Sequence, residues 1–172
     1  DEVLMRIMDG LMSFPSLLLA LLVISTLGPN ILYIVATIGI VTIPGVSRVM
    51  RSATLSLKEQ EFVQSARLRG ESAAYIIFRE ILPNTLPIVG VELSVRLSYS
   101  ILIVSSLGFL GLGVQPPSPD WGLMIAQSRQ FLSSAPWVAL SPAVAVASLV
   151  VGVNILTDGI RQASNLPREA SS

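Results

Sequence analysis

Apolar residues follow one another in this chain over stretches much longer than the helices of a soluble domain require. Between residues 10 and 47 no side chain is charged. At about 1.5 Å of rise per helical residue, that stretch can cross a hydrocarbon core of about 30 Å twice. A turn is expected at Gly28-Pro29-Asn30, because Gly and Asn tolerate turn dihedral angles and Pro cannot continue the helix before it. The pattern predicts membrane-spanning helices near residues 11–28 and 31–48.

Two further apolar stretches predict two more spans, at residues 86–110 and 137–156. Each is long enough to cross a bilayer, although the first contains Glu92 and Arg96. The predicted fold class is therefore all-α: a polytopic membrane helix bundle with about four transmembrane helices. Residues 1–172 are interpreted as one transmembrane domain.

A charged segment separates the second span from the third. Residues 48–79 carry too many charged side chains for a lipid-facing helix, so this segment is expected outside the bilayer. Within it, residues 58–78 are mostly helix formers interrupted by Gly70, which predicts short surface helices. A short isolated helix cannot bury its own apolar residues, so the segment needs a surface to pack on. The chain's own spans, the membrane surface and a protein partner all remain open.

Lys and Arg residues fall almost entirely on one side of the predicted spans. Because cytoplasmic loops keep an excess of positive charge, that side is predicted to be cytoplasmic, together with both ends of the chain. Residues 111–136 then form the outer connection, with Trp121 and Trp137 at the level of the lipid headgroups. The cations on the cytoplasmic side are Arg6, Arg48, Arg51, Lys58, Arg67, Arg69, Arg79, Arg161 and Arg168, against Arg129 on the outer side.

Composition narrows the class of function. Hydrophobic residues make up 52% of the 172 residues and charged residues 13%, which is more apolar surface than a compact soluble domain usually hides. A net charge of zero argues against nucleic-acid binding, and the lack of His and Cys removes the usual metal and thiol ligands. No nucleophile and base pair stands out, so no catalytic, cofactor-binding or metal-binding residue is predicted and the chain is not expected to be an enzyme. No G-x-x-x-x-G-K-[ST] motif is present, so any nucleotide must be bound by another subunit.

The charged segment contains a recognisable motif. Gln64-Ser65-Ala66, then Gly70, then Ile81-Leu82-Pro83 resembles the cytoplasmic loop E-A-A-x3-G-x9-I-x-L-P of ABC importer permeases. The spacing matches, whereas Gln64, Ser65 and Glu80 depart from the pattern's letters.

Three further stretches resemble the dipeptide, oligopeptide and nickel permease family, in particular the second of its two paired permease subunits. They are MRIMDGLMSFPSLLLALL, SLGFLGLGVQPPSPDWG and NILTDGIRQA, and with the loop they cover nearly the whole chain in family order. Members usually have six spans, and residue 1 is Asp, so the resemblance implies that this is the C-terminal part of a longer protein with one or two helices before it.

The resemblance implies an ATP-driven importer for peptides or similar small solutes in a bacterial or archaeal plasma (inner) membrane. This subunit would form the path with a second permease subunit, receive solute from an extracytoplasmic binding protein, and couple to ABC ATPase subunits that bind the ATP. The ATPase-coupling loop would comprise Gln64, Ser65, Ala66, Arg67, Gly70, Leu82 and Pro83. Ser65 and Ala66 are small enough for close approach, and Gly70 suits the end of a helix.

Other residues are candidates on chemical grounds. Glu92 and Arg96 lie four apart on one helix face, so they either line the solute path or neutralise each other against a neighbour. The residues Asn154, Asp158 and Arg161 are expected to end the last span, at a cytoplasmic gate or as a helix stop.

Two packing features are also expected. The prolines Pro83 and Pro87 predict a bend where the third span enters the membrane. Close helix packing is expected at Gly108, Gly111 and Gly113.

Two other functions compete with the importer hypothesis. A secondary transporter or channel driven by an ion gradient would use Glu92 and Arg96 as coupling groups and would need no ATPase. A membrane scaffold would use the charged segment to bind some other protein. The motif spacing and the GLGVQPPSPDWG stretch favour the importer.

Overall fold

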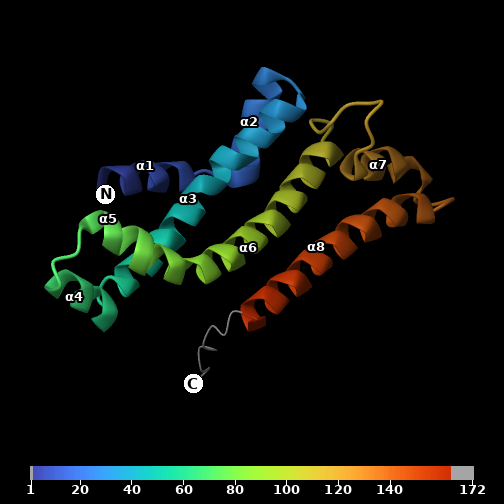
Figure 1. Cartoon of the computed structure of the whole chain (residues 1–172). Helices are drawn as coiled ribbons and strands as arrows, with labels where there is room; N and C mark the ends of the chain where they lie inside the picture. Colours follow the sequence, from blue (N-terminus) through green and yellow to red (C-terminus); the bar gives the residue numbers. More distant parts are fainter. Residues whose placement is uncertain (1, 164–172) are drawn as a thin grey trace.

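The computed structural model describes residues 2–163, and the regular structure in that range is entirely helical, as predicted (Figure 1). Two long helices, α6 and α8, run beside each other, and α3 packs against α6. The elements are α1 (Glu2–Met12), α2 (Ser16–Leu27), α3 (Ile31–Leu57), α4 (Glu61–Leu68), α5 (Ala73–Tyr75), the π-helix η1 (Ile76–Ile81), α6 (Leu82–Phe109), α7 (Trp121–Gln127), the 3-10 helix η2 (Ser128–Phe131) and α8 (Trp137–Ala163).

Three continuous helices are long and apolar enough to cross a membrane: Ile31–Leu57, Ala73–Phe109 and Trp137–Gln162. The pair α1 and α2 makes a fourth only if it is counted as one span, because the two helices meet at 81°. The predicted straight helix at residues 11–28 is therefore wrong. With 12 residues, α2 is about 18 Å long, too short to cross the hydrocarbon core by itself. Apolar composition did not reveal the break before Pro15, where Ser13 hydrogen-bonds back to the carbonyl of Gly10.

The other predicted spans exist but have different ends. The turn at residues 28–30 is confirmed, with Gly28 at a φ of 91° and the side chain of Asn30 accepting a hydrogen bond from the Leu32 N–H. However, α3 continues beyond residue 48 to Leu57, and α8 continues beyond residue 156 to Ala163. A helix can continue from the bilayer into a charged stretch, because Arg, Lys and Glu are good helix formers.

The third span begins with the π-helix η1, which has more residues per turn than an α-helix. Pro83 follows η1 in the first turn of α6, where a missing N–H costs little, and Pro87 lies inside α6. The Asn84 Nδ2 donates to the carbonyl of Glu80 at 2.6 Å within this winding. The helix curves here in Figure 1, yet it stays continuous from Ala73 to Phe109.

The helix α6 is the central element of the bundle, because it contacts α2, α3, α7 and α8. Its C-terminal half shares an apolar core with α2 and α3. On the other side, the Ser98 hydroxyl donates to Asn154 Oδ1 of α8 at 3.2 Å. The buried core residues are Ala20, Ile24, Ile34, Ile38, Ile103 and Leu107.

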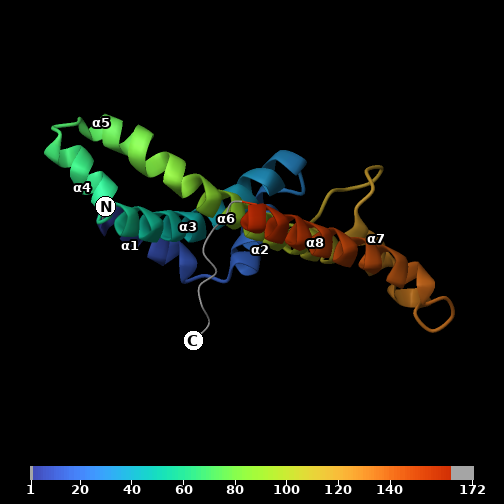
Figure 2. The same cartoon turned by 60° about the horizontal axis from the view of Figure 1, so that its bottom comes forward.

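Most of the charged segments lie near one end of the molecule. The start of α1 and the α4–α5 segment lie near one end of the bundle, and α7 lies near the opposite end (Figures 1 and 2). The C-terminal end of α8 lies apart from α4, beside α6 near Gly90. Most of the cations used to predict orientation belong to α1, the end of α3 and the α4–η1 segment, whereas Arg129 belongs to η2 beyond α7; Arg168 falls outside the described residues.

Glycine residues allow α7 to pack closely against the C-terminal end of α6. A Cβ on Gly122 would collide with the backbone carbonyl of Ser105 and approach the Phe109 amide nitrogen to 2.9 Å. Side-chain atoms added at Gly108 or Gly113 would meet the carboxylate of Asp120. The predicted close packing is thus confirmed for Gly108 and Gly113.

Gly111 has a different role from the two packing glycines. It turns the chain at a φ of 80°, and a Cβ placed on it would meet open space. Asp120 itself caps α7 by accepting the Leu123 N–H at 2.8 Å, and the Arg129 guanidinium stacks 3.9 Å from the centroid of the Phe109 ring. The outer segment is therefore tied to α6 at several points.

Replacing Gly122 by Ala should destabilise this junction by about 1–3 kcal/mol, because the clash is with backbone that cannot move aside. The control is Gly152→Ala in α8, where an added Cβ meets open space and helix propensity favours Ala by about 1 kcal/mol. The midpoint of thermal unfolding in detergent should fall for Gly122→Ala and hold or rise for Gly152→Ala. Equal midpoints for the two variants would contradict the close packing.

Candidate functional site

The charged segment between the second and third predicted spans folds into a defined helical element. Gln60, in an extended conformation, precedes α4, and the helix ends at Gly70, whose φ is 77°. The Glu71 N–H donates to the Ala66 carbonyl and the Gly70 N–H to the Arg67 carbonyl, at 3.2 and 3.0 Å. These two bonds form a Schellman motif, which favours Gly at the left-handed position. The predicted helix-ending role of Gly70 is confirmed.

The segment packs on its own chain. Val63 and Ala66 of α4 are fully buried against Ile76 and Ile81 of η1. Arg69 lies 3.7 Å from carboxylate oxygens of both Glu71 and Glu80, which are mostly solvent-screened contacts of small energy. The question left open by the sequence is answered, because η1 is the surface that receives the apolar side of α4.

This packing changes the meaning of one predicted loop residue. Ala66 has no exposed surface, so it shapes the loop rather than offering a contact to a partner. Arg69 adds little to holding α4 on η1, because its contacts with Glu71 and Glu80 are long and solvent-screened. The other predicted coupling residues remain exposed: Gln64, Ser65, Arg67, Gly70, Leu82 and Pro83.

One exposed residue of α4 was not among the predicted site residues. Leu68 is 89% exposed at the end of α4, although Val63 and Ala66 of the same helix are covered. Phe62, also on α4, is 36% exposed. The two exposed apolar side chains on one short helix make it a candidate contact surface. Leu68 is apolar in the sequence, but only the packing of Val63 and Ala66 on η1 shows that Leu68 is left exposed.

A second candidate site lies inside the third span. The Arg96 Nε donates to Glu92 Oε1 at 2.6 Å, and Glu92 is 9% exposed. The guanidinium lies over Gly45 of α3, so closely that a Cβ on Gly45 would collide with it. The predicted pairing of these two charges is therefore present, within one helix and against a neighbouring one.

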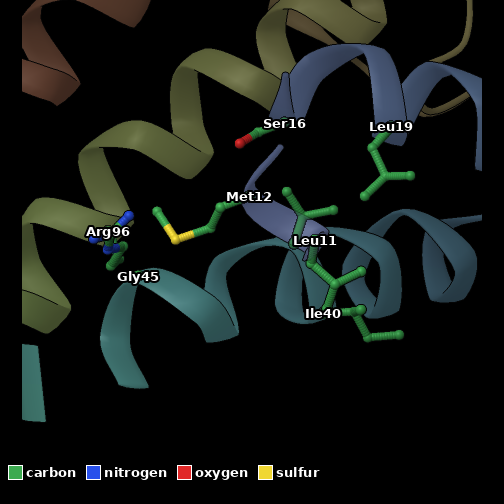
Figure 3. Close-up of a pocket in the computed structure, with 8 residues that line it drawn as sticks. Leu11, Met12, Ser16, Leu19, Ile40, Gly45 and Arg96 are labelled. Carbon is green, nitrogen blue, oxygen red and sulfur yellow. The ribbon is translucent and has the colours of Figure 1, made fainter. Parts of the chain in front are cut away.

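Arg96 also borders a pocket. Its volume is about 80 Å³, and it lies between the α1–α2 break, α3 and α6 (Figure 3). Met12 and Ser16 form the side of the pocket at the helix break. The other lining residues are Leu11, Leu19, Ile40, Val41, Gly45 and Arg96.

The three residues predicted at the end of the last span lie in the final part of α8. Arg161 is in the last turn, as predicted, whereas Asn154 and Asp158 lie further inside and do not stop the helix. Their residue types allow the helix to continue, and Gly159 costs only about 1 kcal/mol relative to Ala. Asn154 instead joins α8 to α6 through Ser98. A role at a cytoplasmic gate stays a prediction.

Comparison with known proteins places the chain in a family. A family model described as the inner membrane component of binding-protein-dependent transport systems matches residues 1–165. The chain belongs to this family. The resemblance drawn from the sequence motifs is thereby confirmed, and the family favours a transport permease over an ion-gradient-driven transporter.

Relatives within the family agree. The dipeptide transport system permease protein DppC of Alkalihalophilus pseudofirmus is 42% identical over 163 residues, which is 95% of this chain and 54% of that protein. The glutathione transport system permease protein GsiD of Salmonella typhimurium is 44% identical and that of Escherichia coli 43%, with the same coverage. The chain spans about half the length of these relatives.

The neighbouring residues Ser65 and Ala66 provide a matched test of the loop's packing. Ala66→Leu should overfill the covered side of α4 and destabilise the loop by about 1–3 kcal/mol, whereas Ser65→Leu adds the same side chain on the exposed side. The measurement is the rate of tryptic cleavage after Arg67 and Arg69, which tracks how often the loop opens. Ala66→Leu should raise it at least about fivefold. Equal cleavage of both variants would mean that α4 does not pack on η1.

Proposed function

We propose that this chain is the membrane-embedded part of a permease subunit in an ATP-driven importer for peptides or similar small solutes. The match of residues 1–165 to the transport-component family carries the proposal. The named relatives transport a dipeptide and glutathione, which points to small peptides as the class of solute. The chain forms the translocation path with a second permease subunit, and an extracytoplasmic binding protein delivers the solute.

The α4 segment couples the path to an ABC ATPase. It is fixed to η1 by the buried contacts of Val63 and Ala66, and η1 continues directly into α6. A displacement of α4 is therefore transmitted to the central helix of the bundle. Gly70 keeps the segment compact without adding a side chain to the contact surface.

Leu68 is the central contact of this docking surface. Burying its side chain in a groove of the ATPase contributes about 1.5–3 kcal/mol, a large share of what a small surface can supply. Ser65 allows close approach beside it, and the exposed cation Arg67 suits an acidic rim. Leu82 and Pro83, at the start of α6, complete the coupling loop.

Orientation follows from the positions of the cations. The end of the bundle that carries α4 and the start of α1 faces the cytoplasm, because Lys and Arg residues concentrate there. The α7 segment then faces the binding protein. Glu92 and Arg96 border the solute path within the membrane, which accounts for a pair of charges in an otherwise apolar span.

The docking surface is tested by copurifying the membrane complex with its ATPase. Leu68→Glu should reduce the recovered ATPase at least about tenfold, because it places a charge in an apolar contact. Leu132→Glu is the matched control, since Leu132 is 53% exposed beyond η2 at the opposite end of the bundle. The control should retain the ATPase.

Membrane insertion of both variants is checked by the amount of protein in the membrane fraction. If wild type recovers no ATPase, the importer function is wrong. If Leu68→Glu retains as much ATPase as Leu132→Glu while inserting normally, the docking surface lies elsewhere.

A further inference from the structure

The guanidinium of Arg96 has only part of its hydrogen-bonding capacity occupied. Glu92 accepts from Nε, and among the described residues no acceptor is recorded for the two terminal nitrogens. The side chain is 30% exposed, and it borders the pocket at the α1–α2 break (Figure 3). An arginine in an apolar span keeps four N–H groups that need acceptors, and a carboxylate matches them in shape and charge.

The opposite wall of the pocket is also polarised in favour of an anion. Ser16, the first residue of α2, lines it, and no side chain caps that helix. The first hydrogen bond inside α2 runs from the Leu19 N–H to the Pro15 carbonyl, so the three preceding N–H groups have no intrahelical partner. The positive N-terminal end of α2 and the guanidinium of Arg96 therefore border the same pocket.

We propose that this pocket binds the carboxylate of a solute as it passes through the membrane, with Arg96 as the contacting residue. The inference rests on the transport function proposed above. The volume of about 80 Å³ accommodates a carboxylate group but not a whole peptide, so the remainder of the solute extends into the path. Peptides always offer such a group at their C-terminus unless it is blocked.

Glu92 sets the strength of binding. Its carboxylate neutralises the guanidinium in part and accepts the hydrogen bond from Nε, which leaves the two terminal nitrogens for a ligand. An isolated Arg in the membrane would hold an anion tightly, whereas a transport path needs binding weak enough for release. Glu92 is therefore a positioning residue, and its removal should strengthen carboxylate binding while slowing release.

Gly45 sets the position of the guanidinium. A Cβ at this residue collides with the far end of the Arg96 side chain, which can move, rather than with backbone. The change Gly45→Ala should therefore shift the guanidinium at little cost to the fold. It tests the geometry of the site separately from its charge.

The test is the rate at which phenylglyoxal, an arginine-selective reagent, modifies Arg96 in membranes containing the assembled protein. Peptide mass spectrometry resolves each arginine, and Arg129 on the outer segment serves as the internal control. Acetate should slow modification of Arg96, while acetamide and chloride at equal concentration should not. Arg129 should react equally in all three.

Variants then examine how the pocket works. Glu92→Gln should give the same protection at about tenfold less acetate, since one opposing charge is gone. Gly45→Ala should leave Arg96 reactive but reduce the protection. Equal protection by acetamide or chloride, no protection by acetate, or no modification of Arg96 under any condition would each overturn the carboxylate site.

This experiment requires neither ATP hydrolysis nor uptake. If Arg96 is not protected by acetate, the importer function is unaffected. If no ATPase copurifies, a carboxylate site measured by protection of Arg96 is likewise unaffected. The two proposals can therefore fail independently.

Discussion

The hydrocarbon core of a bilayer offers no hydrogen-bond partners, so each backbone and side-chain polar group within it must be satisfied by the protein. Long helices satisfy the backbone groups, because their N–H and C=O groups pair with each other within the helix. Hydroxyl groups inside the spans hydrogen-bond to carbonyls of their own helix, as Thr42 does to Ile38 and Ser106 to Leu102. The two charges of the third span pair with each other. Where the first helix pair breaks, the polar backbone comes to lie beside the pocket that Arg96 borders.

The helix α6 connects the features on which transport would depend. At its N-terminal end it continues from η1, the surface on which α4 packs, and at its C-terminal end it packs against α7 through close glycine contacts. Between these ends it carries the charge pair and the Ser98–Asn154 bond to α8. Under the proposed function, a movement of α4 would act on the same continuous helix that borders the pocket.

Long apolar runs were sufficient to predict the class of fold and the approximate position of the spans. They could not locate the helix ends, because Arg48, Asp158 and similar residues tolerate both helix and water. The break at Pro15 was also missed, because a proline alone does not mark a break: Pro44, Pro87 and Pro142 all lie inside continuous helices. The motif brings the loop residues together in the sequence, but periodicity could not tell that Ala66 is covered while Leu68 is left exposed. Which residues of α4 are covered depends on η1, a separate element that packs against α4.

The most direct test of the account is uptake by the reconstituted assembly, with its ATPase, second permease and binding protein, using labelled dipeptides and glutathione. Uptake should require ATP on the side of the ATPase and persist when ionophores collapse the ion gradients. Uptake that needs no ATP and stops when the gradients collapse would contradict the account and establish an ion-driven transporter instead.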